Sequence, residues 1–253
     1  MTGPSAADDP AAELAVAGLT RLSSCDWPGQ LVATVFLQGC PWDCVYCHNP
    51  DLIDPRRPGT IPWDDVLAFL ADRRGLLDGL VFSGGEPTRQ DLTGAVAQVR
   101  ALGFKVGLHT MGAYPSRLAR LLPLLDWVGF DVKAAPGRLE SIVRRPGAGR
   151  TMARSLDLLL ASGVDHQLRT TWGPGVQTAA EAAAAQDWVS RRGGGQVVLQ
   201  PVRPDGARPE FVQRFQAIRG GPRTTVSPDL GMTTTVDAAP GTAGIARRRL
   251  DQD

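Results

Sequence analysis

The chain has 253 residues, of which 43% are hydrophobic, and its 27 basic and 26 acidic residues leave a formal net charge of +1. This balance argues against the strongly basic surfaces that bind nucleic acids or anionic membranes. No segment approaches the roughly eighteen consecutive apolar residues of a membrane span, and the N-terminus has neither a basic start nor an apolar run. We therefore expect a cytoplasmic protein with a sizeable core, built as one large domain or two small ones.

Strand-like and helix-like runs alternate along most of the chain. Residues 1–12 are small, acidic and proline-containing, which is typical of disordered termini. The expected strands cover 14–22, 31–37, 80–82, 104–108, 127–132, 167–172 and 196–199. The expected helices cover 62–73, 90–102, 116–122, 150–161 and 179–191. About six βα units result, the pattern of a parallel sheet covered by helices, and too few for a closed eight-fold barrel.

Beyond Pro201 the alternation decays. A helix over 210–218 is expected, and it would end the ordered domain of residues 13–218. Residues 219–253 are rich in threonine, proline and glycine, so we expect a flexible tail there, with a solvated arginine run at 247–249.

Three of the four cysteines, Cys40, Cys44 and Cys47, lie in one short loop directly after an apolar run. In a reducing cytosol such spacing favours metal binding over disulfides. A structural zinc site needs four protein ligands, whereas three thiolates suit an iron–sulfur cluster with one iron left open to an outside ligand. Two candidates for a fourth ligand stay open. His48 would complete a zinc site, and Cys25 is more typical of a small buried hydrophobic residue.

The cysteines are separated by three and two residues, an aromatic residue precedes the last one, and His48-Asn49-Pro50 follows. This pattern resembles the radical S-adenosylmethionine (SAM) enzymes. Residues 35–40, leading into residues 46–49, resemble glycyl-radical-enzyme activases, especially the activating proteins of anaerobic ribonucleoside-triphosphate reductase. The likeness extends from about Gly18 to Gln200. It implies an α/β fold, a partial (β/α)6 TIM-like barrel that is open on one side.

Polar and glycine-rich segments follow several of the expected strands. The carboxyl ends of parallel strands meet at one edge of a sheet, where active sites gather. Ser83-Gly84-Gly85-Glu86 follows the strand at 80–82, and its two glycines would let a ligand approach the backbone closely. Asp131 and Lys133 end a later strand and should point the same way. Each has a simpler explanation, since Gly-Gly is often only a turn and an Asp–Lys pair is often a surface ion pair.

The resemblance implies a role for each of these residues. The three cysteines would hold a 4Fe-4S cluster, and SAM would chelate its open iron. Reductive cleavage of SAM would then yield a radical that abstracts hydrogen from a glycine of a partner enzyme, with no side chain acting as acid or base. The residues implied as SAM contacts are Tyr46, Ser83, Gly84, Gly85, Glu86, His109, Asp131, Lys133, Arg169 and Gln200. For Tyr46 packing in the loop, and for Arg169 anchoring of the barrel rim, remain alternatives.

The resemblance also implies two protein partners. One is a glycyl radical enzyme, with anaerobic ribonucleotide reductase as the expected one, and the other is a one-electron donor such as flavodoxin or ferredoxin. Two other functions stay open. The chain could be a radical SAM enzyme acting on a small molecule, or a zinc-stabilised binding module.

His109 departs from the activase pattern. Activases commonly place Asp-Thr-Asn-Gly after the third strand, and this chain has His109-Thr110-Met111-Gly112. We expect a protonated His109 to supply the positive charge that a cation supplies in some activases. A SAM carboxylate and Asp131 would raise its pKa above the ordinary value near 6.5. Alternatively, His109 only packs at the barrel rim.

Overall fold

The computed structural model describes residues 14–220. The expected disordered segment at 1–12 and nearly all of the expected tail at 219–253, with its arginine run, lie outside the described residues. One sheet organises the described part, and its seven strands follow each other in chain order. They are β1 (Val16–Ser23), β2 (Val32–Leu37), β3 (Gly79–Gly84), β4 (Lys105–Thr110), β5 (Trp127–Asp131), β6 (His166–Trp172) and β7 (Val197–Pro201).

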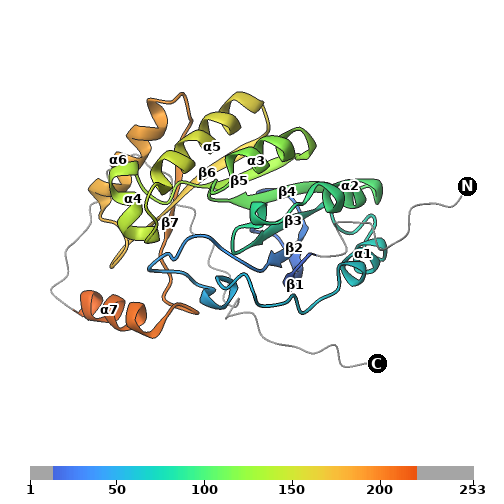
Figure 1. The fold of residues 1–253 in the computed structure, drawn as a ribbon, viewed down its shortest axis with the longest axis horizontal. Helices are drawn as coiled ribbons and strands as arrows, with labels where there is room; N and C mark the ends of the chain where they lie inside the picture. The colour runs from blue at the N-terminus through green and yellow to red at the C-terminus, as the bar shows by residue number, and fades with distance from the viewer. Residues whose placement is uncertain (1–13, 221–253) are drawn as a thin grey trace, which may run out of the picture.

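The six strands β2 to β7 are parallel, and β1 pairs with β2 in the antiparallel direction. The strand order starts at β1 and ends at β7, so the sheet curves without closing on itself (Figure 1). This confirms the predicted α/β fold, an open partial barrel of six parallel strands.

The helices between the parallel strands pack along their outer side, and one more helix follows the last strand. They are α1 (Trp63–Ala71), α2 (Thr93–Ala101), α3 (Pro115–Leu121), α4 (Pro136–Val143), α5 (Ala148–Ser162), α6 (Ala179–Ser190) and α7 (Pro209–Gly220). Short 3-10 turns cover Pro50–Leu52, Pro87–Arg89 and Leu122–Leu124. Neighbouring helices α1 and α2, α3 and α5, and α4 and α5 contact each other.

Helix α4 was not predicted from the sequence. Its Pro136-Gly137 start is typical of a turn, but Pro136 occupies the first helical position, where its missing N–H costs nothing. The ends of the next two helices carry clearer capping signals. Gly147 and Gly163 flank α5 in left-handed conformations, and Thr178 and Glu181 form a capping box at the start of α6.

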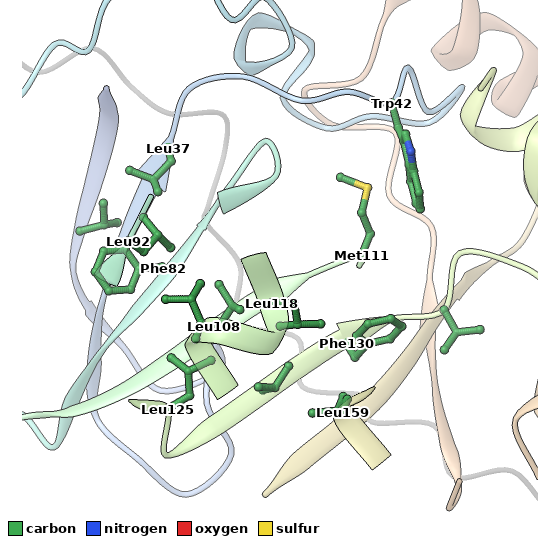
Figure 2. Close-up of a cluster of buried hydrophobic side chains, with 14 of the residues drawn as sticks. Leu37, Trp42, Phe82, Leu92, Leu108, Met111, Leu118, Leu125, Phe130 and Leu159 are labelled. Carbon is green, nitrogen blue, oxygen red and sulfur yellow. The ribbon is translucent and has the colours of Figure 1, made fainter. Parts of the chain in front are cut away.

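The main core lies between the sheet and the helices. Phe82, Leu108 and Phe130 come from three neighbouring strands and are fully buried (Figure 2). A second, smaller cluster lies inside the curve of the sheet, where the rings of Trp27 and Trp127 stack with centroids 5.5 Å apart. Because both faces of the central strands are covered, these strands are apolar over most of their length, as parallel strands usually are.

Candidate functional site

Alternation along the strands places one polar set on the inner face of the barrel. Residues two apart in a strand face the same side, and the register sets Asp131 beside Arg169, and Thr171 beside Gln200. These side chains line a single cavity at the carboxyl ends of the strands. Its lining includes nearly all of the expected site residues, namely Cys40, Cys44, Tyr46, Cys47, Ser83, Gly84, Gly85, His109, Asp131, Lys133, Arg169 and Gln200.

The three-cysteine loop leaves the carboxyl end of β2 and lies over this cavity. Two backbone hydrogen bonds hold its first residues, from Gly39 N–H to Leu52 O at 2.8 Å and from Cys40 N–H to Ile53 O at 3.1 Å. All three thiols of the loop line the cavity. Cys25 does not, because it is exposed in the connection between β1 and β2, at the opposite end of the sheet.

Burial governs the chemistry of these thiols. It raises the pKa of all three, that of Cys44 to about 11, and for Cys44 the nearby Lys133 ammonium opposes the shift. The metal-free thiols are therefore protonated at neutral pH, and a metal must displace their protons to bind thiolates.

The arrangement of the thiols suits a cluster better than a single ion. Within residues 14–220, no three His, Cys, Asp or Glu side chains converge on a point that could hold one metal ion. A zinc ion needs such convergence, with each sulfur about 2.3 Å from the metal. In a cubane each thiolate binds a different iron, so thiols that surround a cavity without converging fit the larger group.

Gly84 and Gly85 lie where the segment after β3 crosses the start of the cysteine loop. A Cβ on Gly84 would lie 2.3 Å from the Leu37 nitrogen, and one on Gly85 would lie 2.4 Å from the Gly39 oxygen. Gly84 also has φ of +116°, which disfavours any side chain. Protein backbone, rather than an approaching ligand, is thus what excludes a side chain here, which corrects the reason expected from the sequence.

The Glu86 side chain does not line the cavity, in contrast to its expected role as a SAM contact. It is fully buried and accepts hydrogen bonds from the hydroxyls of Thr88 and Thr110 and from the backbone N–H groups of Thr88 and Met111. Burial raises its pKa despite these four donors. Glu86 therefore joins the segment after β3 to the end of β4 and supports the cavity from behind.

Asp131, Lys133 and Arg169 form a charged group on the cavity wall. The Asp131 carboxylate lies 2.9 Å from Lys133 Nζ and 2.8 Å from a guanidinium nitrogen of Arg169. Burial raises the pKa of Asp131, but the two cations outweigh it and lower the pKa overall. At least three quarters of each side chain is shielded, so this is not an exposed surface pair. The expectation that Asp131 and Lys133 point the same way is confirmed.

His109 lies beside this group, and its protein neighbours favour the neutral imidazole, whereas a protonated one was expected. Burial and then the Arg169 guanidinium lower its pKa to about 4. Its Nε2 lies 2.6 Å from the Asp26 carbonyl oxygen, and its Nδ1 lies 3.3 Å from Ser83 Oγ. A neutral ring that donates from Nε2 and accepts at Nδ1 satisfies both contacts. Arg169 Nη1 lies 3.2 Å from the same Nε2 and already supplies a positive charge there.

Several cavity residues were missed as site residues in the sequence. Asn49, Ile53, Thr110, Met111 and Thr171 also line the cavity, and so does His48, which was considered only as a zinc ligand. All of them directly follow or end a strand, or belong to the cysteine loop and its continuation, so the rule that identified Asp131 could have found them. Trp42 of the cysteine loop lines the cavity too. Figure 2 shows Trp42 and Met111 near each other, on the side of the cluster away from Leu37 and Leu92.

A sequence profile of the radical SAM superfamily matches residues 34–189, which is more than half of the chain. The chain belongs to this superfamily. It is 31% identical over 172 residues to a Methanocaldococcus jannaschii protein whose provisional name is glycyl-radical enzyme activating enzyme, with 64% of this chain and 69% of that protein covered. The pyruvate formate-lyase-activating enzyme of Clostridium pasteurianum is 30% identical over 114 residues, covering 43% of this chain and 48% of that enzyme. The chain thus spans only about half of this second relative.

Solved structures share the fold. SuiB of Streptococcus suis bound to S-adenosylmethionine has a TM-score of 0.53 at 13% identity, covering 66% of this chain and 39% of SuiB. TYW1 with a lysine–pyruvate adduct has a TM-score of 0.54 at 13% identity, covering 71% and 67%.

Membership of the superfamily identifies the chain as a radical SAM enzyme whose cofactors are a 4Fe-4S cluster and SAM. Cys40, Cys44 and Cys47 are the residues that would hold the cluster. In residues 14–220, none of the helices has the length and apolarity needed to cross a membrane.

Proposed function

We propose that this radical SAM enzyme activates a glycyl radical enzyme by abstracting hydrogen from a glycine of its partner. The observation that carries the proposal is the likeness to an activating enzyme over 69% of that relative's length. The open sheet supports it, because β1 and β7 do not pair and the cavity lies at the strand ends, where a protein segment can reach it. Anaerobic ribonucleoside-triphosphate reductase is the partner that we propose, on the likeness of residues 35–49 to its activating proteins.

The side chains of the cavity would bind and orient, and the cofactors supply the reactive chemistry. When bound, the cluster and SAM together provide a hydrogen-abstracting radical after one electron enters. Asp131 and Arg169 would bind the charged methionyl end of SAM, since they present both signs of charge on one wall. Trp42 and Met111 would limit the access of water at the apolar side of the cavity.

An electron paramagnetic resonance experiment tests the function. The reconstituted protein would be incubated under anaerobic conditions with SAM, a one-electron reductant and an anaerobic ribonucleotide reductase from the same organism. We expect a glycyl radical signal that requires SAM and is absent with Cys44→Ala. SAM cleavage without a radical on the reductase would exclude this partner, and turnover with a small molecule in the absence of any partner would contradict the activase function.

A further inference from the structure

Asp43 lies between two of the cluster ligands, but its side chain does not line the cavity. One carboxylate oxygen lies 3.2 Å from Arg144 Nη1, just after α4, and the other contacts Arg208 Nη2, just before α7. Arg144 and Arg208 are distant from Asp43 in the sequence, and Arg208 lies beyond the superfamily match at 34–189. Two arginines from separate elements thus hold one carboxylate in the middle of the cysteine loop.

The backbone of the loop is held at the same place. The N–H groups of Asp43 and Val45 donate to the carbonyl oxygens of Val143 and Ile142, each at 3.0 Å. These two carbonyls belong to the last turn of α4 and have no donor within the helix. The cysteine loop therefore caps α4, and the end of α4 fixes the course of the loop between Cys40 and Cys47.

Arg144 adopts a backbone conformation that suits glycine better. Its φ of +52° is the only positive value at a non-glycine position in residues 14–220. The left-handed conformation is unfavourable for a residue with a Cβ, and helices commonly end with a glycine there. Glycine would fit this position with less strain, but it could not reach Asp43.

Arg208 belongs to a segment, residues 202–208, that we name the strap. The strap runs close over the end of the cysteine loop, because a Cβ on Gly206 would lie 2.6 Å from the His48 carbonyl oxygen. Its far end is fixed, since the Phe211 N–H donates to Arg208 O and Phe211 is buried. The Arg208 side chain is 23% exposed and that of Asp43 is 41% exposed, so solvent screens their contact in part.

We propose that Asp43 is a positioning residue for the iron–sulfur cluster, and that with Arg144 and Arg208 it forms an ionic clamp that holds the cysteine loop open around the cavity before iron binds. Three buried thiols that must lose their protons have no attraction for one another. Without the clamp, binding of the cluster would itself have to order the loop, and part of the binding free energy would be lost in doing so. A preorganised site retains its ligand better because this ordering cost is already met by the fold.

Two measurements test the clamp. The first is hydrogen exchange of the Val45 amide in the iron-free protein, followed by NMR. The second is the rate at which a chelator removes iron from the reconstituted protein. We expect Asp43→Asn, which keeps the shape and loses the charge, to lower Val45 protection and to speed iron loss, each by about tenfold, because charge-assisted contacts are lost. Asp43→Glu should restore most of both.

Asp157→Asn is the matched control. Asp157 forms an ion pair with Arg192 at 2.6 Å, outside the cavity lining, and its removal should leave Val45 exchange and iron loss unchanged. Equal exchange and equal iron loss in the parent and Asp43→Asn would overturn the proposal, and so would equal effects of Asn and Glu at this position.

Arg144→Gly separates positioning from overall stability. It removes one arm of the clamp while relieving the left-handed conformation, so we expect faster Val45 exchange with an unfolding midpoint equal to or above that of the parent. A parallel fall of the midpoint and of Val45 protection would assign Arg144 to the fold rather than to the loop and would contradict the clamp. If Asp43→Asn fails to fold, Arg208→Gln and Arg144→Gly still decide the question by the same two measurements.

Discussion

At the scale of single residues, His109 shows how neighbours from distant strands set a protonation state. The ring contacts Trp127 edge-on, with centroids 5.6 Å apart, and lies 3.2 Å from the Arg169 guanidinium. Burial and the Arg169 cation both disfavour an imidazolium. SAM affinity should therefore show no step near neutral pH that depends on this histidine.

The neutral His109 should make the free energy of unfolding depend on pH. Its pKa is about 4 in the folded protein and near 6.5 when unfolded, so only the unfolded state takes up this proton between those values. The contribution is complete above pH 6.5 and falls as the pH decreases toward 4, by roughly 2–3 kcal/mol at pH 4.5. Urea unfolding at pH 7 and 4.5 should show a drop that is smaller by that amount in His109→Gln.

His166→Gln is the control for this prediction, since His166 is exposed and its replacement should leave the drop unchanged. The same drop in the parent and in His109→Gln would show that His109 is not held neutral by the fold.

At the scale of secondary-structure elements, the segments that follow the parallel strands β2 and β3 cross in direct contact with each other. Gly85 N–H donates to Leu37 O, and Glu86 N–H donates to Gly39 O, each at 3.0 Å. The two hydrogen bonds join the glycine segment to the start of the cysteine loop. The two segments proposed to hold the cofactors are therefore one structural unit.

This crossing predicts that Gly85→Ala destabilises the protein even without SAM. Its Cβ would lie 2.4 Å from Gly39 O and 3.0 Å from Leu52 O, so backbone must move. We expect the free energy of unfolding of the iron-free protein to fall by about 2 kcal/mol or more, as overpacked sites do. Gly137→Ala, with no atom within 4 Å of its Cβ, should cause no loss. Unchanged stability with lost SAM binding would instead favour exclusion by the ligand.

The order of strands and helices and the place of the cavity could be predicted from the sequence. Alternating short strands and amphipathic helices define six βα units, and the ends of the strands define the cavity. The pKa of His109 could not, since it depends on burial in the folded protein and on Arg169 from another strand. Asp43 could not be recognised either, because both of its arginines are more than a hundred positions away. Contacts between distant segments set protonation and positioning, and local patterns do not contain them.

At the scale of the whole molecule, the four cysteines are divided between the two ends of the barrel. Cys40, Cys44 and Cys47 line the cavity, and Cys25 is exposed at the opposite end. Anaerobic reconstitution should yield about four irons per chain, as one cubane requires. Alanine at any one of the three cavity cysteines should abolish this, and Cys25→Ala should not. Iron analysis with absorption spectra gives the answer, and one tightly bound zinc per chain without iron would contradict it.

The stacked indoles of Trp27 and Trp127 give the protein an optical signal of its own. Their rings lie 5.5 Å apart with an angle of 16° between their planes, and they join the β1–β2 connection to β5. Two aromatic chromophores this close couple electronically, so the pair should contribute a band of its own to the near-ultraviolet circular dichroism. Any movement of the β1–β2 hairpin away from the barrel separates the rings and removes the band. The inner floor of the barrel is thus visible in solution without an added label.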